Sequence, residues 1–143
     1  MIKKFKELTV EELYGILQLR SEVFVVEQKC IYEDLDGKDL EALHLYEQEK
    51  DQIIAYCRIM EVDPYTFWIG RVVVAKAFRR QQKATLLLKR GLNYILKKAP
   101  QGEIHLSAQV MAMDFYSSLG FIPCGDSYVE DGIPHIHMKY FNR

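Results

Sequence analysis

The sequence predicts one α+β domain over residues 1–143, with a mixed, mainly antiparallel central sheet flanked by helices on both faces. Three observations predict this class. Strand-like and helix-like segments follow one another in the order β, β, β, α, β, α, β, β, and short turn-prone links between the first three strands favour hairpins. A helical segment then connects the third strand to the fourth as a crossover. The 143 residues, of which 49% are apolar, suffice for one continuous core.

The first helix is expected to begin near Thr9. Residues 9–12 have the pattern of a capping box, and Leu8 and Leu13 are spaced for a hydrophobic staple. Apolar residues then continue one helical face as far as Phe24.

Residues 28–41 follow neither period and are predicted to form an exposed loop. An Asp-Gly pair and scattered acids suit a solvated loop. The alternative is a loop that shapes a substrate site, because carboxylates attract a cationic amine. The acids concerned are Glu33, Asp34, Asp36 and Asp39.

The remaining elements follow from apolar alternation, helical spacing and turn residues. Strands are predicted at His44–Gln48, Ile53–Val62, Thr66–Val74 and Ile104–Ala108, helices from Ala84 to Pro100 and over Met111–Leu119, and a last hairpin of Phe121–Val129 and His135–Phe141 turning at Asp131-Gly132.

Composition argues against several classes of protein. A formal net charge of -1 disfavours a general nucleic-acid binder. Cys30, Cys57 and Cys124 have neither the number nor the spacing of a disulfide framework or a zinc site, so we expect reduced thiols and no metal. Without an apolar run long enough for a secretion signal or a membrane span, we expect a cytoplasmic protein that does not bind membranes.

The strongest chemical signal is an apolar strand that leads through a basic turn into an amphipathic helix, residues 69–88. The backbone N–H groups of such a turn and the positive end of the helix dipole attract an anion. Arg79, Arg80 and Lys83 would oppose that dipole in a merely solvated turn, which favours a phosphate ligand.

Two segments resemble a known family. Arg79–Ala84 is similar to the pattern Arg/Gln-x-x-Gly-x-Gly/Ala, with Gln82 where the first glycine is usual. Gln109–Phe121 is similar to Asn-x-x-Ala-x-x-Phe/Leu-Tyr-x-x-x-Gly-Phe, with Gln109 in place of the leading Asn. In this order they resemble the GNAT superfamily of acyl-CoA-dependent N-acetyltransferases, whose sheet has a splayed central strand pair. Within it, residues 20–28, 69–72 and 130–135 resemble the ElaA group, which often lacks the first glycine as well.

The resemblance implies acetyl-CoA as co-substrate, and the turn offers a physical reason to bind it. Successive N–H groups can chelate the pyrophosphate, and the exposed backbone of the preceding strand can pair with the pantetheine amides and face the thioester oxygen. Gln82 is expected to keep an ordinary φ or to accept a small strain. The residues expected to bind the cofactor are Val72, Val73, Val74, Arg79, Arg80, Gln81, Gln82, Lys83, Ala84, Thr85 and Gln109.

Tyr116 is the candidate general acid, since the motif places its hydroxyl near the departing sulfur. A core aromatic with a wet tip is the alternative. No carboxylate lies at residues 67–70 to serve as base, so we expect a water chain that ends on His44, Glu27 or His135. For both histidines an ordinary place at a strand end is the alternative.

The acceptor is expected to be a primary amine of a small molecule or peptide, attacked directly without a covalent enzyme intermediate. Glu27 and Arg58 are expected to pair across the acceptor pocket, with His135 nearby. A non-catalytic GNAT-like binding module stays open because of Gln82. A homodimer through an edge strand is also possible.

Overall fold

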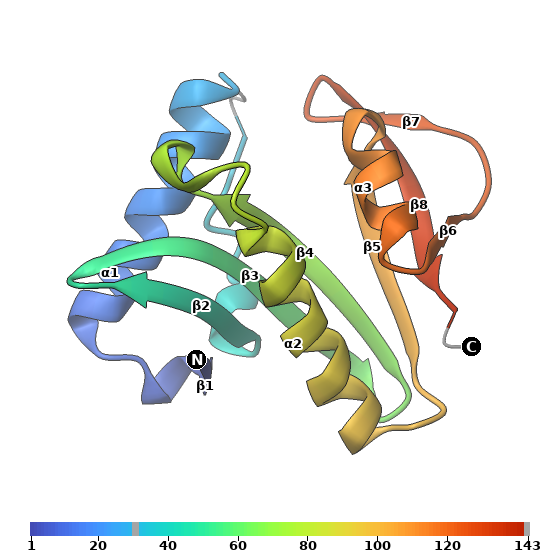
Figure 1. Ribbon diagram of the computed structural model, residues 1–143, viewed down its shortest axis with the longest axis horizontal. Coiled ribbons are helices and arrows are strands. Elements are labelled where there is room, and N and C mark those ends of the chain that lie inside the picture. The colour runs from blue at the N-terminus through green and yellow to red at the C-terminus, as the bar shows by residue number, and fades with distance from the viewer. Residues whose placement is uncertain (30–31, 142–143) are drawn as a thin grey trace.

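The expected elements occur in the expected order in the computed structural model, which describes residues 1–29 and 32–141 (Figure 1), and a short strand that the sequence did not predict precedes them at Ile2–Lys4. The helices are α1 (Val10–Arg20), α2 (Lys83–Lys98) and α3 (Met113–Ser118), with a π-helical segment η2 (Ser21–Glu27) directly after α1. Short 3-10 turns lie at Phe5–Glu7 (η1), Lys38–Leu40 (η3), Lys76–Phe78 (η4) and Val110–Ala112 (η5). The strands are β1 (Ile2–Lys4), β2 (Leu43–Glu49), β3 (Gln52–Asp63), β4 (Thr66–Val74), β5 (Glu103–Gln109), β6 (Phe121–Pro123), β7 (Tyr128–Glu130) and β8 (Ile133–Tyr140).

The predicted mixed, mainly antiparallel sheet is confirmed. Its order over the described chain is β1-β2-β3-β4-β5-β8-β6, with β7 paired to β8. Only the pair β4/β5 is parallel, because α2 carries the chain back between them as a crossover. No described helix is long and apolar enough to cross a bilayer.

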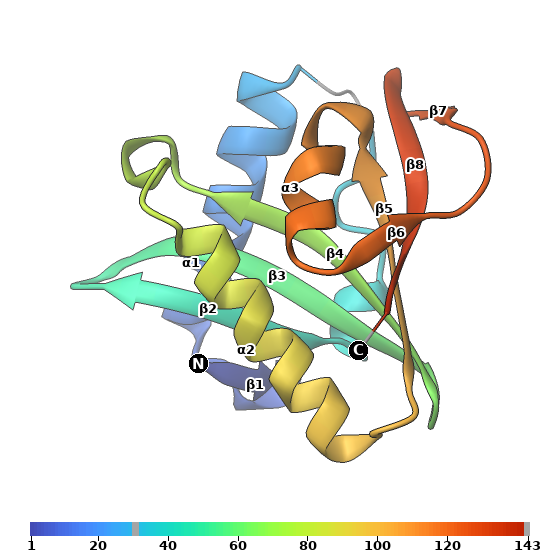
Figure 2. The ribbon, with the colours of Figure 1, turned by 45° about the vertical axis from the view of Figure 1, so that its right-hand side comes forward.

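The central strands β4 and β5 splay, as expected. Their pairing starts at Thr66 opposite Glu103 and ends at Ile69 opposite Leu106. Beyond that point each strand keeps its outer partner, β3 or β8, but the two no longer pair with each other. Figures 1 and 2 show the strands together at one end and apart at the other.

Two apolar clusters hold the helices to opposite faces of the sheet, with α2 in front and α1 behind in Figure 1. One cluster joins α2 and α3 to the sheet around the fully buried Leu88, Ile95 and Ile104. The other joins α1 to the sheet around Ile16 and Tyr46. Helices therefore cover both faces, as the sequence predicts.

The local predictions hold except at three places. The capping box is confirmed, since Thr9 Oγ1 accepts from the Glu12 N–H at 3.0 Å and the Glu12 carboxylate accepts from the Thr9 N–H at 2.9 Å. The first apolar face continues past Arg20 as a π-helix rather than an α-helix. Residues 111–119 begin as a 3-10 turn, and residues 121–129 form two strands instead of one. The hairpin turn at Asp131-Gly132 is confirmed, with φ of 52° and 77°.

Candidate functional site

Two adjoining cavities lie along β4. The larger has a volume of about 760 Å³ and opens between the splayed strands, bounded by η2, β3 and the turn from β7 to β8. The smaller, of about 390 Å³, lies at the turn before α2. Both are lined by Val72, Val73, Val74 and Arg79. The unpaired edge of β4 therefore leads from one cavity into the other.

A β-bulge shapes β4 at this point. Val73 pairs with Tyr56 and Gly70 pairs with Arg58. Two residues of β4, Arg71 and Val72, therefore lie opposite a single residue of β3. Arg71 has a φ of 54°, which is unfavourable for a residue with a side chain. The bulge bends the strand just where it leaves β5, and it turns the Arg71 side chain towards residues 32–36.

The turn before α2 has the conformation of a glycine-rich loop without the glycine. Arg80 and Gln82 have φ of 63° and 59°. Gln82 is the N-cap of α2, yet no side chain caps the first N–H groups there. Of the two expected alternatives the structure shows the strained one, because Gln82 lies in the left-handed region that glycine adopts most easily. The free N–H groups at the helix start suit an anion.

Two of the three cations of the turn form ion pairs with acidic side chains of other elements. Arg79 forms a two-bonded ion pair with Glu27, at 2.6 and 2.8 Å, and also donates to the Val74 carbonyl. Lys83 contacts Glu47 at 3.2 Å. Arg80 makes no ion pair within the described part of the chain. The expected Glu27–Arg58 pair is wrong, since Glu27 lies at the mouth of the cavity and pairs with the turn.

Tyr116 lies at the junction of the motif helix and the larger cavity. Its side chain packs edge-on against Phe115 and Phe121, at 5.1 and 6.0 Å between ring centres, and is 8% exposed. Burial raises the pKa of Tyr116, so its hydroxyl keeps its proton at neutral pH. It lines the cavity next to β4.

The wall beneath the cavity is a buried charge network. Asp39 accepts hydrogen bonds from Arg20 at 2.8 Å and from Arg58 at 2.9 Å, and all three side chains are nearly inaccessible to solvent. Arg58 also binds both oxygens of Asp36, at 2.9 and 2.7 Å. These bonds outweigh the cost of burial and lower the pKa of Asp39, and those from Arg58 lower the pKa of Asp36.

The same network extends to the bulge on β4. Arg71 contacts Asp34 at 2.9 Å and stacks on the ring of Tyr32, whose hydroxyl donates to Asp34. Arg20 also binds Asp34, at 3.1 Å. The prediction of a solvated acidic loop is therefore wrong for three of its four acids, because the arginines that neutralise them come from distant parts of the sequence. Glu33 forms no ion pair in the described residues.

His44 does not line either cavity. Its Nδ1 lies 2.6 Å from the Tyr56 hydroxyl, its Nε2 lies 2.9 Å from the Asp39 carbonyl, and the residue is 1% exposed. Burial lowers its pKa, so the ring stays neutral inside the network. The expectation that His44 serves as the base is wrong, since both of its ring nitrogens already have structural partners.

The far wall of the cavity is the open face of β5, β7 and β8. His135 and Gln109 pair across β5 and β8, and both line the cavity. Gln109 contacts Gln28 at 3.2 Å across the gap between the strands. His105 and His137 form a half-buried stack with Trp68, with ring centres 5.0 to 5.1 Å apart.

The structure brings most of the sequence-predicted site residues together. The larger cavity is lined by Glu27, Arg58, Gln109, Tyr116 and His135, and the smaller by Arg80, Gln82, Lys83, Ala84 and Thr85. Gln81 and His44 line neither. Cys57 and Cys124 are free thiols, and Cys30 lies outside the described residues.

Sequence reasoning missed the aromatic and apolar part of the wall of the larger cavity. Tyr32, Met60, Val62 and Trp68 line the larger cavity. One signal was present in the sequence: Trp68 stands between the core residues Phe67 and Ile69, so strand alternation places it on the opposite face.

Comparisons with known proteins agree on one family. The model of the acetyltransferase (GNAT) domain matches residues 6–141. The chain is 43% identical to protein ElaA of Escherichia coli over 136 residues, 92% of this chain and 89% of that protein. The crystal structure of E. coli ElaA superposes with a TM-score of 0.91 at 39% identity, over 99% of this chain and 97% of that one.

Two further solved structures share the fold. An acyl-CoA N-acyltransferase from Pseudomonas aeruginosa has a TM-score of 0.91 and 39% identity, over 99% of this chain and 97% of that one. A GNAT family acetyltransferase from Elizabethkingia anophelis with acetyl-CoA bound has a TM-score of 0.68 and 15% identity, over 98% and 96%. The family model, the relatives and the splayed strands together show that this chain belongs to the GNAT acetyltransferase family, with the fold of an acyl-CoA-dependent acyltransferase.

Proposed function

We propose that the protein transfers an acetyl group from acetyl-CoA to a primary amine. The observation that carries this proposal is the unpaired edge of β4, which joins the cavity at the turn to the cavity that contains Tyr116. A long, thin co-substrate with a phosphate at one end and a reactive carbonyl at the other matches that path. The acetyl-CoA held by the E. anophelis relative supports the choice of acyl donor.

The residues present fit coenzyme A on structural grounds. The uncapped N–H groups at the start of α2 and the side chain of Arg80 would hold the pyrophosphate. The edge of β4 over Val72–Val74 would bind the amides of pantetheine as a neighbouring strand would. Gln82 would supply backbone rather than side-chain contacts, because its conformation already matches that of the glycine it replaces.

When bound, acetyl-CoA supplies a thioester whose C–S bond is replaced by a C–N bond to the amine. Tyr116, protonated at neutral pH, donates its proton to the departing sulfur. Backbone N–H groups of the open β4 edge stabilise the negative charge that develops on the carbonyl oxygen. The amine enters through the larger cavity, between Trp68 and the far wall of β7 and β8.

A panel of amines mixed with acetyl-CoA tests the proposal, with release of free thiol as the readout. Polyamines, amino sugars, amino acids and peptides with free N-termini cover the acceptor classes. We expect saturable thiol release with at least one of them and a binding heat with acetyl-CoA alone. A binding heat without transfer would favour a non-catalytic acyl-CoA-binding module. If acetyl-CoA gives no binding heat and no amine leads to thiol release, the proposal is wrong.

A further inference from the structure

We propose that His135 is the catalytic base, accepting the amine's proton at Nε2, and that Glu130 is a positioning residue that stabilises the charged ring. This inference rests on the proposed function and deepens it. The sequence alone offers three candidates for this role, and the geometry separates them.

The hydrogen bonding of the His135 ring selects its tautomer. Nδ1 lies 2.7 Å from the carbonyl oxygen of Ile133. A carbonyl oxygen accepts only, so Nδ1 must carry the hydrogen of that bond. In the neutral ring Nε2 is then left with a free lone pair, which is the form that a general base requires. The Ile133 carbonyl thus plays the orienting part that a second residue plays in other histidine bases.

The surroundings of His135 hold the ring at the cavity wall. On β8 it lies opposite Gln109 of β5 and opposite Tyr128 of β7. The Tyr128 ring stacks on it, with centres 6.3 Å apart and planes at 20°, and the His135 side chain is 11% exposed. It lines the same cavity as Tyr116, so the acid and the base act on one volume from different walls.

Glu130 provides the charge that the protonated ring needs. Its Oε2 lies 3.6 Å from Nε2 of His135, and its side chain is 52% exposed. A carboxylate at this distance stabilises the imidazolium form, and its exposure gives the proton a route to solvent. Glu130 therefore acts through Nε2 of His135 rather than on the amine itself.

The other candidate bases are already occupied. Glu27 is bound by Arg79 through two hydrogen bonds, and both nitrogens of His44 have buried partners away from the cavity. Besides Glu130, the cavity is lined by the carboxylate of Asp131, which lies on an exposed turn. An imidazole is the side chain whose charge changes nearest neutral pH, which suits proton transfer better than a solvated carboxylate.

The proton balance is complete without a further reactant. As the C–N bond forms, the amine nitrogen loses one proton to Nε2 of His135. As the C–S bond breaks, the sulfur receives one proton from Tyr116. The proton on His135 leaves past Glu130 to solvent, and Tyr116 takes up a proton again before the next turnover.

The first experiment compares His135→Asn with His137→Asn. Asparagine can still donate to the Ile133 carbonyl but cannot accept a proton at neutral pH. His137 lies on the same strand and the same face, yet it lines neither cavity. With acetyl-CoA and the amine from the panel that the wild type acetylates fastest, we expect H135N to lower kcat/KM about 100-fold or more, with an unchanged Kd for acetyl-CoA. H137N should stay within about threefold of the wild type.

Two readouts separate a base from a merely structural residue. The pH–rate profile of the wild type should contain a limb that H135N lacks, because asparagine does not titrate. Glu130→Gln removes the charge 3.6 Å from Nε2 of His135, so it should alter the same limb of the profile. Long-range ¹H–¹⁵N spectra of protein with labelled histidine should show His135 with the hydrogen on Nδ1 in the absence of any ligand.

Three results would overturn the proposal. If H135N keeps kcat/KM within threefold while the wild type is active, His135 is not the base and the proposed function still stands. A hydrogen on Nε2 in the neutral ring would contradict the assignment in the same way. If the wild type binds no acetyl-CoA and transfers to no amine, the proposed function itself is wrong, and the role of His135 with it.

Discussion

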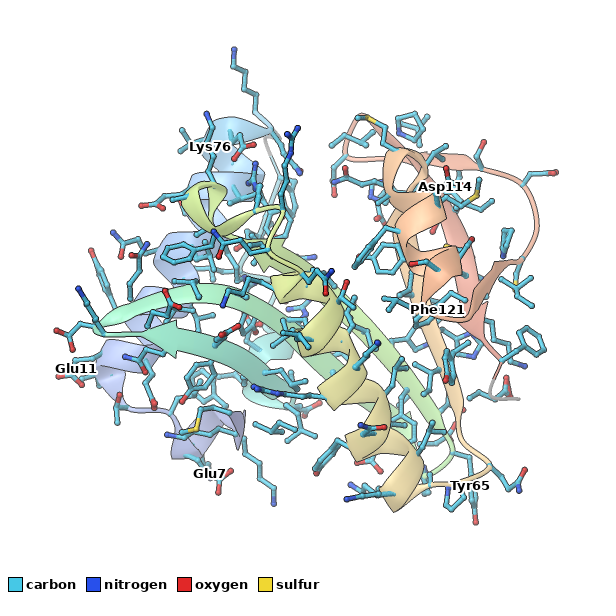
Figure 3. The ribbon with its side chains drawn as sticks, viewed as in Figure 1. Glu7, Glu11, Tyr65, Lys76, Asp114 and Phe121 are labelled. Carbon is cyan, nitrogen blue, oxygen red and sulfur yellow. The ribbon has the colours of Figure 1, made fainter. Side chains whose placement is uncertain are left out.

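The two cavities along β4 are held together by different kinds of interaction. The smaller is formed mainly by one continuous segment of chain, and its features are backbone ones: free N–H groups and a left-handed Gln82. The larger is assembled from η2, residues 32–38, five strands, α3 and a turn, and its wall rests on buried ion pairs. A backbone site tolerates many side chains, whereas a wall of buried charges depends on every partner. Figure 3 labels one residue on each side of the gap between β4 and β5. Lys76 lies beside the turn before α2, and Asp114 lies in α3.

The most severe test of this contrast is Asp39→Asn. The substitution leaves the buried guanidinium groups of Arg20 and Arg58 without their shared carboxylate. Loss of one partner from a buried ion pair costs about 3 kcal/mol or more, so we expect the free energy of unfolding to fall by that amount in urea titrations. Glu61→Gln is the matched control, because its pair with Lys98 is exposed and contributes little. Equal midpoints for the two variants would contradict a structural role for the network.

The network also predicts a pH dependence. The folded-state pKa values of Asp36 and Asp39 are lowered by their arginines. A carboxylate of this kind stabilises the fold at pH values above its unfolded pKa, and that contribution is lost as the pH falls through its folded pKa. Wild-type stability should therefore decline below about pH 5, and D39N should decline less over the same interval. Parallel declines would assign the acid sensitivity to other groups.

Tyr116→Phe tests the larger cavity. Without the hydroxyl the sulfur leaves unprotonated, so we expect kcat to fall about 100-fold while the Kd for acetyl-CoA stays the same. Tyr140→Phe is the control, because Tyr140 packs on Phe121 in the same aromatic cluster but lines neither cavity. A weaker Kd with an unchanged kcat would instead make Tyr116 a core aromatic.

Substitution of Gln82 tests whether the turn depends on conformation rather than on the side chain. A β-branched residue is disfavoured at a φ of 59°, so Gln82→Val should lower the free energy of unfolding by about 1 kcal/mol. Gln82→Gly should be neutral or slightly stabilising, and it should bind acetyl-CoA as tightly as the wild type in calorimetry. Weaker binding by the glycine variant would show that the glutamine side chain contacts the ligand.

The smallest effect is expected for Glu27→Gln. Glu27 and Arg79 are both more than one-third exposed, so their pair contributes little to stability. Release of Arg79 frees a cation at the edge of both cavities, and we expect acetyl-CoA to bind two- to fivefold more tightly at low salt. Weaker binding would instead mean that the pair holds the turn in its binding conformation.

Local sequence signals predicted most of the elements and the turn that forms the smaller cavity. Thr9 and Glu12 are three residues apart, and the capping box that they form depends on nothing else in the chain. The turn at residues 79–85 and the helix with Tyr116 follow from short motifs in the same way. The π-helical end of α1 and the break between β6 and β7 were not predictable, since packing decides both.

The ion pairs around the larger cavity could not be derived from local signals. Asp39 is 19 residues from each of its two arginines in the sequence, in opposite directions, and spacing alone could not pair them. Glu27 illustrates the same limit, because its partner Arg79 is 52 residues away and the expected partner Arg58 is bound elsewhere. Composition alone predicts that the acids of residues 28–41 form a solvated loop.

By itself the sequence determined the order of the predicted elements, the family and the basic turn before α2, because those depend on neighbours along the chain. The tertiary structure decided which charges neutralise one another, which nitrogen of His135 contacts the Ile133 carbonyl and which side chains line the larger cavity. The physical reason is that a buried charge or a histidine tautomer is set by whatever group the fold brings within hydrogen-bonding distance, at any separation in the sequence.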